Sequence, residues 1–137
     1  MQAVEQGTAE ATVLAGVPCR PAGMTDPDLL DELDRWEQLG RIVDARRVAL
    51  AGEVAWRSRA QLGDGSLAKR QGDRDATDLL AREVRVGVRE AKRRTALGIR
   101  VRAGLSITGE EIPSRWTHVA AALEAGAIGV DAGRVIV

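Results

Sequence analysis

The sequence is short of the residue types that build most catalytic and metal sites. Cys19 is the only cysteine and His118 the only histidine among 137 residues, and neither Phe nor Tyr occurs. A single cysteine excludes an internal disulfide and a cysteine-cluster zinc site. His118 has no second histidine, cysteine or acid at ligand spacing, so we expect it to face solvent. We therefore predict no catalytic residue, no metal site and no cofactor.

Long apolar runs are also missing. No stretch approaches the ~18 consecutive apolar residues of a membrane-spanning helix, and no basic segment followed by an apolar run begins the chain. We expect a soluble, cytoplasmic protein with no membrane partner.

Aromatic residues make up only 2% of the chain, all of them Trp, although 45% of the residues are apolar. The core must therefore consist of Ala, Val, Leu and Ile. Abundant Ala with few aromatic residues favours helices over sheets. At this length we predict one all-α domain of about five helices, in which a long N-terminal helix packs on a helix–turn–helix-like pair and a C-terminal helical pair.

Residues 1–24 mix small residues, Gly and Pro without a sustained period, and we predict a poorly ordered tail. The helical domain then covers 25–137. Asp26 and Pro27 form a helix start signal, and the first helix is expected to reach about Leu62. Two apolar rows predict contacts on more than one side of this helix. The first row is Leu29, Leu33, Trp36, Val43, Leu50 and Val54, and the second is Leu39, Ile42, Ala49 and Trp56.

The middle of the chain is predicted to form a helix, a turn and an arginine-rich helix. After a polar connector over 66–73, a helix is expected from Asp75, a break at Val86-Gly87, and a helix from Arg89 to about Ala103. The connection from Ala81 to Arg89 is longer than the three-to-four-residue turn of a DNA-binding helix–turn–helix. Helix pairs of this kind also occur in all-α proteins that bind no nucleic acid.

The last third of the chain is predicted to begin with an irregular link over 105–113. An amphipathic helix follows, with Trp116, Val119, Leu123 and Ala127 on one side and Gly126 as its stop signal. Apolar residues over 132–136 suggest the start of another helix. Because the chain ends on Val-Ile-Val, we expect a domain cut before its last packing partners.

The net charge is zero, but the charges are segregated. Residues 1–34 hold seven acids and one base, whereas 69–102 hold eleven bases and five acids. Such asymmetry is consistent with a polyanion partner or with pairing inside the molecule. The candidate nucleic-acid-binding residues are Arg82, Arg85, Arg89, Lys92, Arg93 and Arg100.

Three helical patterns resemble a known family. They are Asp78-Leu79-Leu80-Ala81, Arg89-Glu90-Ala91, and the run from Pro113 through Ala122-Leu123 and Ala125-Gly126-x-Ile128 to Arg134-Val135-Ile136. Over about residues 26–137 the chain resembles the domain of unknown function 222, the 13E12-repeat family of actinobacteria. The resemblance implies the helical N-terminal part of a protein that carries a C-terminal HNH nuclease module. This chain lacks the paired histidines of such a module.

Two functions are compatible with the sequence. The first is a non-catalytic accessory domain of an HNH-endonuclease-type protein, which contacts DNA through the arginine-rich helix. Contacts to phosphates would give affinity with little sequence preference and a steep dependence on salt. The alternative is a structural or protein-interaction module whose partner is the nuclease module or another protein chain.

Overall fold

The computed structural model describes residues 20–137 of the chain. The predicted all-α class is confirmed, since helices make up most of this part and the only strands in it are two very short ones. Most of the predicted tail lies outside the described residues. Its last residues form the 3-10 turn η1 (Pro21–Gly23).

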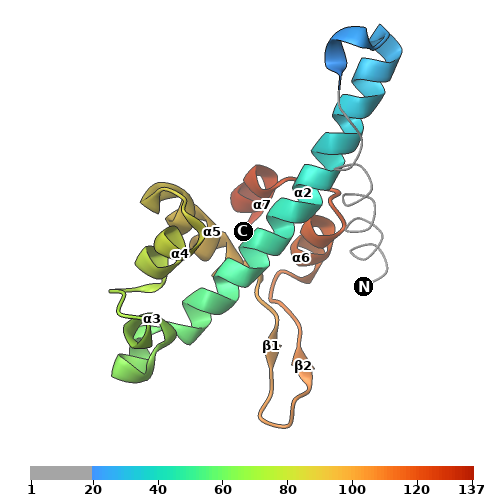
Figure 1. Ribbon diagram of the computed structural model, residues 1–137. Coiled ribbons are helices and arrows are strands. Elements are labelled where there is room, and N and C mark those ends of the chain that lie inside the picture. The colour runs from blue at the N-terminus through green and yellow to red at the C-terminus, as the bar shows by residue number, and fades with distance from the viewer. Residues whose placement is uncertain (1–19) are drawn as a thin grey trace.

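The long helix α2 (Asp26–Arg57) is the element on which the others assemble (Figure 1). It begins where predicted, with the Thr25 hydroxyl accepting a hydrogen bond from the Asp28 N–H. Pro27 occupies the first turn, where its missing N–H costs no helical hydrogen bond. The helix runs unbroken to Arg57, somewhat short of the predicted end. Its axis crosses the whole molecule, and its N-terminal part extends beyond all other helices.

Between α2 and the helical pair lie two short elements in place of the predicted polar connector. The 3-10 segment η2 (Ala60–Gly65) is followed by α3 (Leu67–Arg70). Ser66 is buried and caps α3 through its hydroxyl, which accepts from the Lys69 N–H. The Ser58 hydroxyl accepts from the Ala68 N–H at 3.1 Å and so ties α3 to the end of α2.

The pair α4 (Ala76–Val84) and α5 (Val88–Val101) lies on one side of α2. The central core cluster consists of Ala51, Leu80 and Ala91, one residue from each of the three helices, with Ala81 and Val86 packed against it. Predominantly small side chains therefore hold α2, α4 and α5 together. That agrees with the composition, in which Ala replaces the missing aromatic residues.

The predicted irregular link is a β-hairpin that projects from the helices (Figure 1). Its strands are β1 (Gly104–Leu105) and β2 (Glu111–Ile112), antiparallel with Gly104 opposite Ile112. Gly109, at a φ of 85°, allows the tight turn at the tip. Strands this short are below the length at which an alternating pattern can be detected in a sequence.

The C-terminal helical pair is α6 (Thr117–Glu124) and α7 (Val130–Ile136), and both contact α2. Gly126 ends α6 as predicted, at a φ of 69°. A Cβ at Gly126 would lie only 2.8 Å from Ile42 Cγ1. The carbonyl oxygen of Gly126 accepts a hydrogen bond from Arg41 Nε at 2.8 Å. This glycine therefore both stops the helix and fits the loop against α2.

Candidate nucleic-acid interface

The turn between α4 and α5 is three residues long, Arg85 to Gly87. The longer connection that the sequence predicted is wrong, because α4 continues to Val84 and α5 begins one residue early. Arg85 takes the left-handed conformation, at a φ of 56°, which is uncommon for a residue other than glycine. The Val86 N–H donates to the Ala81 carbonyl and closes α4. A turn of this length is typical of helix–turn–helix pairs.

The close approach of α2 and α5 determines which side of α5 remains free. Gly52 and Gly98 face each other, and a Cβ at Gly98 would lie 2.7 Å from Gly52 Cα and would overlap the Val48 carbonyl oxygen. Ala91 and Thr95 are buried on the same side of α5. The neighbouring Ile99 is exposed, whereas Gly98 is buried. Since α5 is anchored here, its opposite side faces away from α2.

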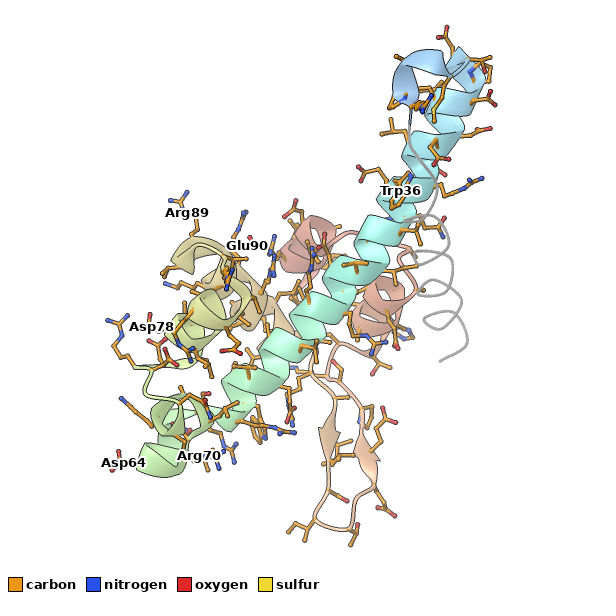
Figure 2. The ribbon with its side chains drawn as sticks, viewed as in Figure 1. Trp36, Asp64, Arg70, Asp78, Arg89 and Glu90 are labelled. Carbon is orange, nitrogen blue, oxygen red and sulfur yellow. The ribbon has the colours of Figure 1, made fainter. Side chains whose placement is uncertain are left out.

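Cations gather on that opposite side. Arg89, Lys92, Arg93 and Arg100 are all exposed, as the sequence predicted, and they follow one another at helical spacing. The one acid within α5, Glu90, accepts from Arg94 Nε at 2.8 Å on a neighbouring side of the helix. We call these four cations the α5 basic face. Figure 2 labels Arg89 at the N-terminal end of α5, pointing into solvent.

The other two candidate cations lie differently. Arg82 is bound by Asp73, with distances of 2.9 Å from Nη2 and 3.1 Å from Nε to the carboxylate oxygens. These hydrogen bonds lower the pKa of Asp73 and raise the pKa of Arg82. Arg85 is exposed in the turn, beside the N-terminus of α5. At the far end of the basic face, Arg100 donates to the Val137 main-chain oxygen.

Four of the six candidates are therefore unpaired within residues 20–137. No ion pair in this part of the chain involves Arg85, Arg89, Lys92 or Arg93. The Asp73–Arg82 pair had no signal in the sequence, because nine residues separate the partners and no single helix holds both. Spacing along one helix predicted the basic face but not this pair.

A second cation cluster, which the sequence did not predict, surrounds Trp56 at the end of α2. Arg59 and Arg102 stack on the indole, with guanidinium carbons 4.1 and 4.6 Å from its centroid. Glu53 accepts from Arg57 at 2.7 Å and from Arg102 at 2.8 Å. These two hydrogen bonds, Arg57's first, lower the pKa of Glu53. The cluster joins the ends of α2 and α5 and leaves its cations paired or stacked.

His118 is exposed near the start of α6, and no group of three or more His, Cys, Asp or Glu side chains in residues 20–137 could hold a metal ion. A cleft of about 490 Å³ between α2, α5 and α6 has an apolar floor that includes Ile42, Val101 and Leu123. No helix in this part of the chain is long and apolar enough to cross a membrane.

No protein-family model, no curated protein and no solved structure matches the chain. Relatives therefore supply no function for it. Any function must be inferred from the positions and charges of the chain's own side chains.

Proposed function

We propose that this chain is a non-catalytic helical domain that binds duplex nucleic acid through the α5 basic face. The observation that carries the proposal is the arrangement of the α5 basic face, Arg89, Lys92, Arg93 and Arg100, on the exposed side of the helix. The only acid of α5, Glu90, pairs with Arg94 on a neighbouring side. In keeping with the family that the sequence resembles, the domain would serve as an accessory part of an HNH-endonuclease-type protein.

The dimensions of α5 suit this role. The basic face spans eleven residue steps, which is about 16 Å of helix. An α-helix fits the major groove of B-form DNA, and in helix–turn–helix proteins the second helix occupies it. Here the second helix is α5, its inner side is held by α2, and a three-residue turn joins it to α4. Arg85 in that turn would lie beside the phosphates of one groove edge.

The chemistry of the contact side chains indicates what kind of binding to expect. Guanidinium and ammonium groups on a helix surface neutralise phosphates and release the counterions bound there. Such contacts give affinity and orientation but little choice of base sequence. We therefore expect weak sequence preference. Three to four phosphate contacts would give a slope of about −3 to −4 in log affinity against log salt.

The test is a salt series of binding to a labelled mixed-sequence duplex. The variant replaces Arg89, Lys92 and Arg93 by Ala. The matched control replaces Lys69, Arg70 and Arg115, which are exposed and lie outside α5, so that the two triple variants lose the same charge. We expect the α5 variant to lose most of the affinity and to flatten the salt slope by about 3, and the control to change little.

Two results would reject the proposal. One is no binding by the wild-type chain even at low salt. The other is an equal loss in both triple variants, which would mean that net charge alone attracts the duplex. Circular dichroism of each variant verifies that the helices remain.

The second candidate function is a protein-interaction module without nucleic-acid contact. It is supported by the apolar side chains of the projecting hairpin, since Leu105 is 72% exposed and Ile107 fully exposed. Val135 and Ile136 of α7 are exposed as well. A stable complex that persists at high salt and is lost on Ile107→Asp would favour this function over the first.

A further inference from the structure

The outer side of α2 carries a row of large apolar side chains that no described residue covers. It is the first of the two apolar rows for which the sequence predicted contacts. In the structure Leu33 is 57% exposed, Leu50 62% and Trp36 39%. Leu29 and Val43 are exposed as well. Figure 2 shows Trp36 on the part of α2 that extends away from the other helices.

These residues follow a heptad repeat. Leu29, Trp36, Val43 and Leu50 are each seven residues apart, and so are Leu33, Gly40, Arg47 and Val54. The two series alternate at spacings of four and three, which is the pattern of a coiled-coil contact row. We call these eight positions the α2 seam. The part of the seam from Leu29 to Val43 is exposed, whereas towards the C-terminal end Leu50 lines the cleft shared with α5 and α6 and the neighbouring Ala51 lies in the central core.

Gly40 is the one seam position without a side chain, and no contact among residues 20–137 accounts for it. A Cβ there would meet no atom within 4 Å. Glycine in a helix interior costs about 1 kcal/mol relative to Ala. Gly52 has an internal reason, because Gly98 lies against it. The open space above Gly40 is one helical turn from Trp36, the largest side chain of the seam.

We propose that the α2 seam binds a second copy of the chain, with the two α2 helices antiparallel. The two helices are aligned so that Trp36 of each copy lies over Gly40 of the other. In this register the residue numbers of any two facing seam positions add to 76. Leu33 then faces Val43 of the second copy, and Leu29 faces the stem of its Arg47. At the centre of the contact the large Trp36 side chain therefore lies against Gly40, which has none, and this complementarity in size allows close packing.

The charges beside the seam favour the antiparallel over the parallel pairing on balance, with one like-charge approach, Glu37 to Glu37 of the other copy, left at its centre. Glu32 and Arg46 flank the seam on the same side, and in the antiparallel arrangement Glu32 of each copy approaches Arg46 of the other, twice per dimer. Arg46 forms no ion pair among residues 20–137. Glu32 already accepts from Arg35 Nη1 at 3.2 Å and from Trp36 Nε1 at 2.8 Å in its own copy, so Arg46 would be an additional partner. A parallel pair would instead place Arg47 against Arg47 in the seam and Glu32 beside Glu37. Like charges at those positions disfavour the parallel form.

The shape of the molecule is compatible with this contact. The paired stretch, residues 29–47, would be about 27 Å long. The N-terminal part of α2 extends beyond the other helices in Figure 1, so this part of the seam is the part open to a second copy's α2. A contact of this size, with four apolar side chains per copy, belongs among small interfaces, and we expect dissociation in the micromolar range.

The first experiment is sedimentation velocity over a concentration series. We expect the wild-type chain to change from monomer to dimer. Leu33→Asp should raise the dissociation constant at least about tenfold, because a carboxylate would be buried in the seam. Ile107→Asp makes the same change at an exposed residue of the hairpin and should leave the dimer intact. A monomer at every concentration overturns the proposal, and so does a dimer that only Ile107→Asp breaks.

The second experiment tests the register by charge reversal and by size. Arg46→Glu would place two acids together and should weaken the dimer, whereas Glu32→Arg combined with Arg46→Glu should restore it. Gly40→Leu fills the space under Trp36 and should also weaken the dimer, although it suits the isolated helix. If the double reversal fails to restore association, or Gly40→Leu strengthens it, the antiparallel register is wrong.

Discussion

The two ends of α2 differ in how their side chains are used. From 38 to 57 the helix has four buried residues, Leu39, Val48, Ala51 and Gly52, and the last of these lies against Gly98 of α5. From 26 to 37 it carries three Leu and one Trp, and none of these residues is buried. Apart from Leu39 and Val48 the buried residues of α2 are therefore small, whereas Leu33, Trp36 and Leu50 are exposed. In this chain a close helix crossing is marked by Gly and Ala, and the row of large apolar residues at the outer end of α2 is exposed.

The largest effect should come from filling the crossing point. Gly98→Val would place two methyl groups where the main chain of Gly52 and Val48 already lies. Overpacking a core typically costs 1–3 kcal/mol, and here the obstacle is backbone that cannot rotate away, so we expect a loss of about 3 kcal/mol or more. Urea unfolding followed by circular dichroism measures it. A stability close to wild type would mean that α2 and α5 do not meet at these glycines.

The second effect compares a buried leucine with an exposed one. Leu80→Ala removes a side chain that is 8% exposed in the central cluster and should lower the free energy of unfolding by about 3 kcal/mol. Leu33→Ala, on the outer end of α2, should cost less than about 0.5 kcal/mol in the monomer. Both are measured by urea unfolding at high dilution. Equal losses would show that the outer end is covered by the chain itself.

Gly40 offers a smaller effect of opposite sign. Gly40→Ala should raise the free energy of unfolding of the monomer by about 0.5–1 kcal/mol, because Ala has the higher helix propensity and meets no atom there. Thermal unfolding at a concentration below dimer formation measures it. A decrease would mean that Gly40 contacts another part of the monomer.

The smallest effect concerns the ion pairs that join the ends of α2 and α5. Glu53 is partly exposed, so Glu53→Gln should cost about 0.5 kcal/mol at pH 7. The folded state lowers the pKa of Glu53 below its ordinary value of 4.5, chiefly through the hydrogen bond from Arg57. The stabilisation is therefore complete above about pH 4.5 and is lost as pH falls through the lower, folded-state pKa. Urea unfolding of both proteins from pH 7 to 3 should show the difference vanish.

The helices that were predicted well have end signals that act locally. Asp75 caps α4 through a 2.9 Å hydrogen bond from the Asp78 N–H, and Gly126 stops α6 with its positive φ. Such signals depend on a few neighbouring residues and can be recognised without the fold. The α5 basic face was likewise predictable, because helical spacing alone places Arg89, Lys92 and Arg93 on one side.

What the sequence could not supply depends on contacts between distant residues. Periodicity groups Leu29, Leu33 and Trp36 on one face, but it does not tell whether anything covers that face. The crossing of Gly52 and Gly98 joins residues 46 positions apart and leaves no pattern in either helix. The hairpin and α3 were missed because elements of two to four residues are too short to show a period.

Amide hydrogen exchange along α2, at two protein concentrations, tests the contrast between its two ends most directly. We expect residues 42–57 to be protected at both concentrations, because α5 and the central cluster cover them. Residues 28–38 should exchange rapidly in dilute protein and become protected in concentrated protein, as the seam pairs with a second copy. Equal protection of both ends in dilute protein, or rapid exchange of the outer end at every concentration, would contradict this account.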